Sequence, residues 1–442
     1  MKPDTVGYAA DFLERHDIRT VEVSLVDLAG ALRGKRLPAE AFRSGGLRGE
    51  VGFSSALYAW DYAAEVFTDD RYNWATGYPD IFLRPDLATL RLVPWRPATA
   101  FVVCDVVDDQ GEAVDVGPRH ILRRCLAGLE AAGYSARVGL ETEFYVLDPE
   151  TRTPRTQRNP CYSLHDGSDL EPMLAEVRAA LSAAGAEVEA SGAEYGPGQA
   201  EINLRYADPL SAADDLVFLR YAVKQIAARH GMLATFMPKP FTELSGSGLH
   251  VHQSLWNSAG ENIFWDAGTG GLSEPARRYL AGLLRYVPET YAVAAPTPNG
   301  YKRIVDHSFA PTTLSWGSDN RSVAVRALVR GTEGTRLEYR AATSDANPYL
   351  LTATTLAAGL AGIRDGLTPA APASTDAYET AEHGRLPTDP AVAARLLRDS
   401  SFAKSVLGER AVNLVATVTE RETSLHRAQV GDWERNRYLE AV

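Results

Sequence analysis

Along residues 139–148, apolar and polar side chains alternate with the period of an extended strand. Alternate residues of such a strand share a face, so Leu140 and Phe144 point to one side while Glu141 and Glu143 point to the other. The segment therefore predicts a half-buried strand whose polar face carries two carboxylates. Because neighbouring carboxylates repel each other, a positive partner is expected beside them.

The same alternation recurs in three further segments. Their polar faces carry Glu201, Asn203 and Arg205; His250, His252 and Ser254; and Arg336, Glu338 and Arg340. A solvated face of an antiparallel sheet would explain any one of these segments alone. Together they contain acids, imidazoles and guanidinium groups with almost no lysine, which is unusual for a wet face. We therefore predict that the four polar faces line one interior funnel.

Other periodicities predict the elements around these strands. Residues 20–38 predict two strands joined by a turn at Ala29 and Gly30, and thus a β-rich N-terminal domain of residues 1–105. Residues 106–442 form the predicted second domain, in which helices and strands are interspersed. The expected fold class is α+β.

Helical spacing predicts several helices in the second domain. Residues 118–133 begin at a proline, repeat apolar side chains on one stripe and end at a glycine. Ser168 with Glu171 predicts a capping box for the next helix. A helix is expected to begin after Ser211 and to reach Gly231, and residues 389–442 predict terminal helices.

Composition narrows the class of protein. The 442 residues include 45 basic and 57 acidic side chains, and the net charge of -12 argues against a nucleic-acid binder. The chain lacks an apolar run of about 18 residues and a secretory signal pattern at its start, so we expect a cytoplasmic protein without membrane contact. Cys104, Cys125 and Cys161 fit no disulfide framework or metal-knuckle spacing, which predicts buried free thiols.

The chemistry of the predicted funnel suggests phosphoryl transfer. Mg²⁺ and Mn²⁺ prefer carboxylate oxygens with an occasional imidazole, and such ions would offset the repulsion among the acids. Arginines suit phosphate and carboxylate groups that bridge to those ions. The chain has no P-loop, no GxGxxG before a helix and no HExxH, so the common nucleotide and zinc motifs do not account for the pattern.

Six segments spread over nearly the whole chain resemble the glutamine synthetase superfamily, bacterial type I, and most of all its γ-glutamylamine synthetase branch. They are ETEFYVLD, EYGPGQAEINL, TFMPKPFTELSGSGLHVHQSLW, PNGYKRIV, SDNRSVAVR and RLEYRAATSDANPYL. The resemblance implies an N-terminal β-grasp domain, a catalytic α/β domain that forms a β-funnel, and a homododecamer of two hexameric rings. It also implies that ATP phosphorylates the γ-carboxylate of L-glutamate before an amine displaces phosphate.

The resemblance also assigns roles to residues of this chain. Two metal sites, occupied by two or three Mg²⁺ or Mn²⁺ ions in total, would use Glu143, Glu194 and Glu201, and Glu141, His250 and Glu338. The catalytic and glutamate-binding residues would be Arg303, Gly246, Arg340 and, for the transferred phosphate, Arg321. ATP would contact Glu189, Tyr206, His252, Ser254, Arg326 and Arg336.

Two departures concern the amine. Family members that use ammonia carry an aspartate where this chain has Gly52, and a flap glutamate where it has Phe309. An amine pocket that has lost two acids and gained an aromatic wall disfavours NH₄⁺ and suits a substituted amine. We therefore expect Gly52 and Phe309 to belong to the substrate site. Asp306 or His307 of the flap is a candidate replacement base. Ser245 stands where the family often has asparagine, beside the expected glutamate contact.

These observations predict an ATP-dependent ligase that joins glutamate to a primary amine. Ethanolamine or another small monoamine is expected first, a polyamine second and an aromatic amine third. Two alternatives stay open, namely ordinary glutamine synthesis from ammonia and a nucleotide-binding pseudoenzyme that regulates or scaffolds. Phosphate release with ammonia at a low KM would indicate an ordinary glutamine synthetase. ATP binding without turnover of any amine would indicate a pseudoenzyme.

Overall fold

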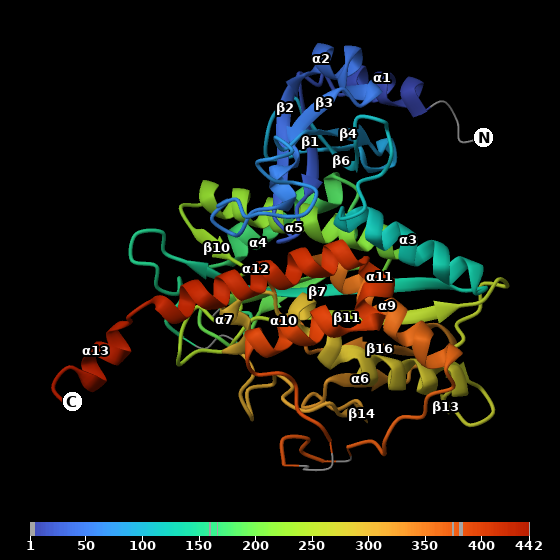
Figure 1. Ribbon diagram of the computed structural model, residues 1–442, viewed down its shortest axis with the longest axis vertical. Coiled ribbons are helices and arrows are strands. Elements are labelled where there is room, and N and C mark those ends of the chain that lie inside the picture. Colours follow the sequence, from blue (N-terminus) through green and yellow to red (C-terminus); the bar gives the residue numbers. More distant parts are fainter. Residues whose placement is uncertain (1–4, 159–160, 166, 374, 380–382, 442) are drawn as a thin grey trace.

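The computed structural model combines an N-terminal sheet, a larger central sheet and helices that pack around the latter (Figure 1). This arrangement confirms the α+β class. The structure describes residues 5–158, 161–165, 167–373, 375–379 and 383–441. Within this part of the chain, none of the helices has the length and apolar character needed to cross a membrane.

The N-terminal sheet has the strand order β2-β1-β6-β4-β3, with β5 beside β6. Its strands are β1 Thr20–Val26, β2 Leu32–Pro38, β3 Val51–Ser54, β4 Asp80–Pro85, β5 Arg91–Leu92 and β6 Thr99–Val107. The predicted turn is confirmed, since Gly30 links β1 to β2 at φ 78°, a left-handed conformation that glycine adopts freely. β6 continues past the expected domain boundary at residue 105, and the division into two domains stays a prediction.

The central sheet has the order β14-β15-β16-β11-β7-β9-β8, with β10 beside β7. The strands predicted to share a funnel face, β9, β7, β11 and β16, are consecutive neighbours in it. The bounds are β7 Ser135–Leu147, β8 Val188–Ala193, β9 Gln199–Leu204, β10 Leu233–Thr235, β11 Leu249–Trp256, β14 Trp316–Ser318, β15 Val325–Leu328 and β16 Arg336–Tyr339; β12 Trp265–Asp266 and β13 Gly271–Leu272 form a separate hairpin.

Strand register brings the polar side chains of this sheet together. Glu141 on β7 lies opposite His250 on β11, and Glu143 lies opposite Glu201 on β9. Glu338 on β16 lies opposite a second imidazole of β11. Because a shift of one residue would turn each of these side chains to the other face, the pairing register alone determines this cluster.

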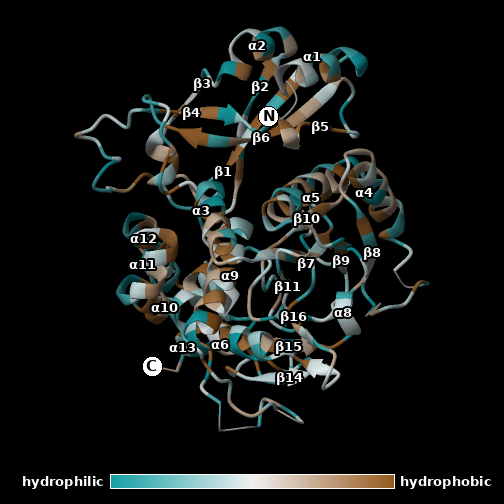
Figure 2. Ribbon diagram, turned by 90° about the vertical axis from the view of Figure 1, so that its right-hand side faces the viewer, coloured by the Kyte–Doolittle hydropathy of each residue, from teal (hydrophilic) through white to brown (hydrophobic). Residues whose placement is uncertain are grey.

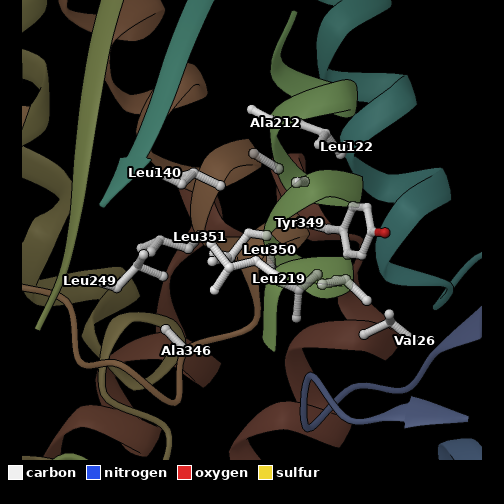
Figure 3. Packing of buried hydrophobic residues seen from close by; sticks show 14 of the residues in the cluster. Val26, Leu122, Leu140, Ala212, Leu219, Leu249, Ala346, Tyr349, Leu350 and Leu351 are labelled. Atoms are coloured by element: carbon white, nitrogen blue, oxygen red, sulfur yellow. The ribbon is translucent and has the colours of Figure 1, made fainter. Parts of the chain in front are cut away.

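The opposite face of the sheet is the core. Leu140 and Leu249 are buried, and Figure 3 shows them beside Leu350 and Leu351 of α9 and near Leu219 of α5. Burying one such leucine contributes about 1.5–3 kcal/mol, so this apolar layer fixes the orientation of the polar one. The hydropathy colouring shows β1 and β6 of the smaller sheet as hydrophobic strands as well (Figure 2).

Helices surround the central sheet, and α13 projects from the body at the C-terminal end (Figure 1). The prediction of a helix near residues 118–133 is confirmed by α3, as are helices within residues 389–442. The helices are α1 Thr5–Arg15, α2 Ala39–Ser44, α3 Pro118–Ala131, α4 Glu171–Ala183, α5 Pro209–Arg229, α6 Glu274–Ala294, α7 Pro298–Tyr301, α8 Gly331–Gly334, α9 Pro348–Arg364, α10 Pro390–Asp399, α11 Ser401–Leu407, α12 Glu409–Ala428 and α13 Asp432–Tyr438, with 3₁₀ turns η1 Gly46–Arg48, η2 Ser55–Tyr58 and η3 Leu87–Thr89.

Two predicted helix starts are wrong. The hydroxyl of Ser168 donates to the carbonyl of Leu164, and α4 begins at Glu171 without a side-chain cap. α5 begins before Ser211, because Asp208 caps it by accepting from the Leu210 N–H at 3.0 Å and a proline follows at the first helical position. The structure shows no disulfide among the described residues; of the three cysteines, which were expected to be buried thiols, Cys104 is buried and Cys125 and Cys161 are partly exposed.

A buried guanidinium group connects the N-terminal sheet to the helices of the central part. Arg119 on α3 contacts Asp86 and Asp214 at 2.8 Å and Asp105 at 2.5 Å. Asp86 follows β4, Asp105 lies on β6 and Asp214 lies on α5, so one side chain joins three elements. Three carboxylates thus compensate one buried guanidinium charge, which makes this contact a firm link between the two parts.

Candidate active site

Two adjoining cavities open over the polar face of the central sheet. The larger, of about 570 Å³, is lined by side chains of β7, β9, β11 and β16 together with loops around residues 161–162, 194–195, 245–246 and 303–309. The smaller, of about 350 Å³, lies over the neighbouring part of the same strands. Glu141 and Asn203 line both cavities, so the two spaces are contiguous at these residues.

The structure brings nearly all of the candidate residues to these cavities. The larger one is lined by Glu141, Glu143, Glu194, Glu201, Gly246, His250, Arg303, Phe309, Arg321, Arg326, Glu338 and Arg340. The smaller one is lined by Glu189, Tyr206, His252, Ser254 and Arg336. Arg326 therefore lies apart from the other candidate nucleotide residues. Gly52 and the candidate bases Asp306 and His307 line neither cavity.

One compact group of ligand atoms comes from three neighbouring strands. The His250 Nδ1 atom lies 2.7 Å from Glu141 Oε1 and 3.7 Å from Glu338 Oε1. The other nitrogen of this imidazole, Nε2, is buried, has no hydrogen-bond partner in the described part of the chain, and lies 3.9 Å from Glu143 Oε1. An unpartnered imidazole nitrogen among carboxylates fits a divalent cation, so the residues present suit the metal that the resemblance implies.

Two of the other expected metal ligands, Glu194 and Glu201, have raised pKa values. Burial, together with the charge of Glu143, raises the pKa of Glu194 to about 7. Burial and the charges of Glu141 and Glu194 raise the pKa of Glu201 to about 9. Among the described residues this set is less tightly grouped than Glu141, His250 and Glu338. Without a cation Glu201 would retain its proton at neutral pH and Glu194 would be only partly ionised, and a divalent ion between them would favour their ionised forms.

Arginines surround the buried Glu338. Arg326 Nη1 donates to its carboxylate at 3.0 Å, and Arg340 makes a short contact with its other oxygen. Burial favours the neutral acid, but the charges of Arg340 and His250 outweigh it and hold the pKa of Glu338 at about 2. Glu338 therefore stays ionised and gives the site a fixed negative charge.

Two other arginines are free to bind an anion. Arg303 is buried and its Nη1 donates to the carbonyls of Arg340 and Ala342 at 3.5 and 3.4 Å, but in the described part of the chain neither Arg303 nor Arg321 makes an ion pair. Burial lowers the pKa of Arg303. The Nε atom of Arg340 is also buried without a partner in the described residues. Guanidinium groups with unused donors on one wall of a cavity suit carboxylate or phosphate oxygens.

The flap that carries Phe309 has an unusual backbone. His307 and Phe309 have φ values of 61° and 59°, which strain residues other than glycine. The Phe309 ring lies 5.9 Å from the ring of Tyr195, centroid to centroid, and both line the larger cavity. Neither Asp306 nor His307 lines it.

The hydrogen-bond partners of Asp306 and His307 explain why neither side chain lines the larger cavity. Asp306 accepts from the Thr312 hydroxyl at 2.6 Å, and His307 Nε2 lies 3.0 Å from an oxygen of Asp376. Both side chains thus hold the flap to neighbouring loops. The structure gives no support to either residue as the replacement base.

Gly52 lies on β3 in the N-terminal sheet. A Cβ atom added there would lie 3.3 Å from Asp80 Oδ2, so the carboxylate of Asp80 occupies the space beside the missing side chain. Gly52 therefore lies outside the two cavities of this chain.

Sequence reasoning missed several residues of the larger cavity. In the segment EYGPGQ, the sequence assigns a role to Glu194 but none to Tyr195. For Asn203, it predicts a place on the polar face but no role. No pattern in the sequence pointed to the loop residues, because loops lack the periodicity that identifies a face. The missed residues are Cys161, Tyr162, Tyr195, Asn203 and Ser308.

Comparisons with known proteins agree with this geometry. Residues 115–438 match the family described as glutamine synthetase, catalytic domain. The chain is 37% identical to a glutamate–isopropylamine ligase of Pseudomonas sp over 98% of this chain and 97% of the relative. It is 38% identical to the gamma-glutamylethanolamide synthetase GlnA4 of Streptomyces coelicolor over 96% and 94%.

A solved structure described as a GmaS/ADP complex superposes with a TM-score of 0.88, at 32% identity, over 98% of this chain and 99% of that one. The family match covers most of the chain, and both named relatives align over nearly their full length. The chain therefore belongs to the glutamine synthetase family.

Proposed function

We propose that this protein is an ATP-dependent ligase that joins the γ-carboxylate of L-glutamate to a primary amine. The observation that carries the proposal is one cavity that combines the group Glu141, His250 and Glu338 with arginines free to bind an anion. The family uses ATP and divalent metal ions. One relative is named for the amine isopropylamine and another for an ethanolamide product, and both names favour an amine over ammonia as the substrate.

The acidic residues would hold two or three Mg²⁺ or Mn²⁺ ions. Glu141, His250 and Glu338 would bind one ion on the nucleotide side, and a second site would use Glu143, Glu194 and Glu201. Such ions, when bound, neutralise phosphate oxygens and favour in-line transfer. The smaller cavity, which borders Glu141, would take ATP through Glu189, Tyr206, His252, Ser254 and Arg336, and Arg326 would contact it from the larger cavity.

The reaction would proceed in two balanced steps. Arg303 and the backbone at Gly246 hold glutamate so that a γ-carboxylate oxygen attacks the γ-phosphorus, and the bond to the bridging oxygen breaks to release ADP. Arg321 and Arg340 stabilise the transferred phosphoryl group. The amine enters as its free base after losing a proton to solvent. Its nitrogen attacks the γ-carbonyl carbon, the bond to the phosphate oxygen breaks, and the second proton leaves with phosphate.

Assembly into a homododecamer in the cytoplasm is part of the proposal. The projecting helix α13 supports assembly. Trp433 on this helix is 65% exposed, and Leu439, the residue that follows the helix, is 75% exposed. Large apolar side chains on a protruding helix are typical of a segment that packs on another chain. A neighbouring copy would also explain how Gly52 reaches a substrate.

The test is phosphate release that depends on both glutamate and ATP, measured with ammonia, methylamine, ethanolamine, putrescine, spermine and aniline. Turnover with at least one primary amine at a higher kcat/KM than with ammonia is expected. Efficient turnover with ammonia alone would indicate an ordinary glutamine synthetase. ATP binding without phosphate release under any amine would indicate a pseudoenzyme.

A further inference from the structure

Tyr195 and Phe309, here called the aromatic pair, form an apolar wall in the larger cavity. Their ring planes are tilted by 59° at 5.9 Å between centroids, a favourable geometry for two aromatic rings. The side chains are unusually exposed for large apolar residues, at 51% for Tyr195 and 56% for Phe309. The pair thus presents ring surface that no side chain of this chain covers fully.

The backbone holds both rings in place. The N–H of Tyr195 donates to the carboxylate of Glu194 at 3.1 Å, and the next residue, Gly196, sits so tightly that an added Cβ would lie 2.1 Å from the Tyr145 hydroxyl. The carbonyl of Phe309 accepts from Arg340 Nη2 at 3.5 Å. Phe309 keeps a left-handed backbone that glycine would adopt at lower cost, which indicates that its ring matters for the site.

The charges around the aromatic pair limit what can pack against it. The carboxylates that line the larger cavity are Glu141, Glu143, Glu194, Glu201 and Glu338, the residues assigned above to the metal ions. The acid beside the pair is Glu194, whose carboxylate accepts from the Tyr195 N–H at 3.1 Å, and it is one of those assigned to the ions; the other residues that line the cavity from these loops, Cys161, Tyr162 and Ser308, carry no carboxylate. A second ammonium group on the amine would therefore find no carboxylate of its own there.

We propose that the aromatic pair selects primary amines with an apolar substituent, such as short or branched alkyl groups. The inference rests on the proposed ligase activity and narrows its substrate class. Among the small monoamines that the sequence places first, it puts alkylamines before ethanolamine, because ring surface favours a methyl group over a hydroxyl group. Each methylene buried against the rings is expected to raise kcat/KM about fourfold.

The experiment compares amines of equal size. Propylamine and ethanolamine have the same number of heavy atoms and differ in a methyl against a hydroxyl group, and pentylamine differs from putrescine in a methyl against an amino group. Propylamine is expected to exceed ethanolamine in kcat/KM by about tenfold, and pentylamine to exceed putrescine by more. Equal or reversed values within either pair would overturn the inference.

Variants locate the preference. Phe309→Ala and Tyr195→Ala are expected to bring the propylamine-to-ethanolamine ratio close to one, and Phe309→Leu is expected to retain part of it. Tyr8→Ala removes an exposed aromatic side chain of α1 and should keep the ratio of the unmodified protein. A ratio that survives both alanine substitutions would overturn the assignment to the aromatic pair.

The same assays separate this inference from the ligase proposal. If the unmodified protein releases no phosphate with glutamate, ATP and any amine, then the proposed function fails. If it turns over the amines without preferring the apolar member of each pair, then the ligase stands and the inference fails. Circular dichroism spectra identify any variant that has not folded, and the leucine variant then carries the test.

Discussion

Two walls of the same cavity are built in different ways. The sheet wall places its acids and imidazoles on adjacent strands, where register fixes their positions and an apolar layer supports them. The flap wall consists of the loop residues Cys161, Tyr162, Tyr195, Ser308 and Phe309, of which Tyr162 and Phe309 have positive φ values of 58° and 59°. Loops tolerate changes that a packed strand does not. We infer that the sheet wall determines the reaction and the flap wall determines which amine takes part.

The largest expected effect is on the sheet wall. Glu141→Gln keeps the size of the side chain and removes the charge that faces His250 at 2.7 Å and His252 at 3.3 Å. Changes to residues that only support metal ligands cost about 10–100-fold, so loss of a ligand should lower kcat/KM by more than about 100-fold. Phosphate release and Mn²⁺ binding, followed by electron paramagnetic resonance, measure the two effects.

The control for this prediction is Glu14→Gln, which removes a carboxylate from the exposed side of α1. It should leave both measurements unchanged. Normal turnover and normal Mn²⁺ affinity in Glu141→Gln would contradict the assignment of this wall to metal binding.

The flap wall predicts a change of preference with a smaller loss of rate. Phe309→Glu places an acid where ammonia-using relatives carry one, and it removes half of the aromatic pair. The kcat/KM for propylamine should fall about tenfold, while that for ammonia should rise, because the new carboxylate favours a small cation and disfavours an apolar group. Phe309→Gln is the matched control, since it should lower propylamine use without the gain for ammonia. Parallel losses for both amines in Phe309→Glu would contradict a role in selectivity.

The nucleotide end of the sheet wall predicts an effect on one substrate only. Arg336 lines the smaller cavity, and its Nε donates to His252 Nδ1 at 3.2 Å. Loss of one hydrogen bond from a charged donor costs about 1.5–3 kcal/mol, so Arg336→Ala should raise the KM for ATP about tenfold or more, with little change in the KM for glutamate. Arg364→Ala, at the exposed end of α9, is the control. Equal rises in both KM values would place Arg336 outside the nucleotide site.

The difference between the walls also explains how much the sequence could reveal. Alternation identified four polar faces, and the structure makes their strands neighbours, because the apolar face of each strand had to be buried on the same core. Helix starts were less certain. Ser168 and Ser211 fit the sequence pattern of caps, but the actual ends are set by other residues, such as Asp208 before Pro209.

The loops carried little signal in the sequence. Phe309 was noticed because it replaces an acid, whereas Tyr195 was missed because an aromatic residue in a loop has no periodic partner. Their pairing depends on how two segments more than a hundred residues apart approach each other, which local patterns do not record. Gly52 presents a further difficulty, since its side of the site would belong to a neighbouring copy.

The smallest expected effect tests whether the flap is strained for the sake of its aromatic side chain. Phe309→Gly removes the ring and relaxes a φ of 59°, which should stabilise the fold by up to about 1 kcal/mol and raise the melting temperature by about 1–2 °C while amine selectivity is lost. Ser308→Gly is the matched control. Ser308 does not have a positive φ, so glycine there adds chain entropy to the unfolded state, and it also removes the hydrogen bond from the Ser308 hydroxyl to the Val305 carbonyl at 2.7 Å; both changes should lower the melting temperature. Opposite shifts at adjacent positions would tie the strain to Phe309 itself, whereas a lower melting temperature in both variants would mean that the ring contributes more to stability than its backbone costs.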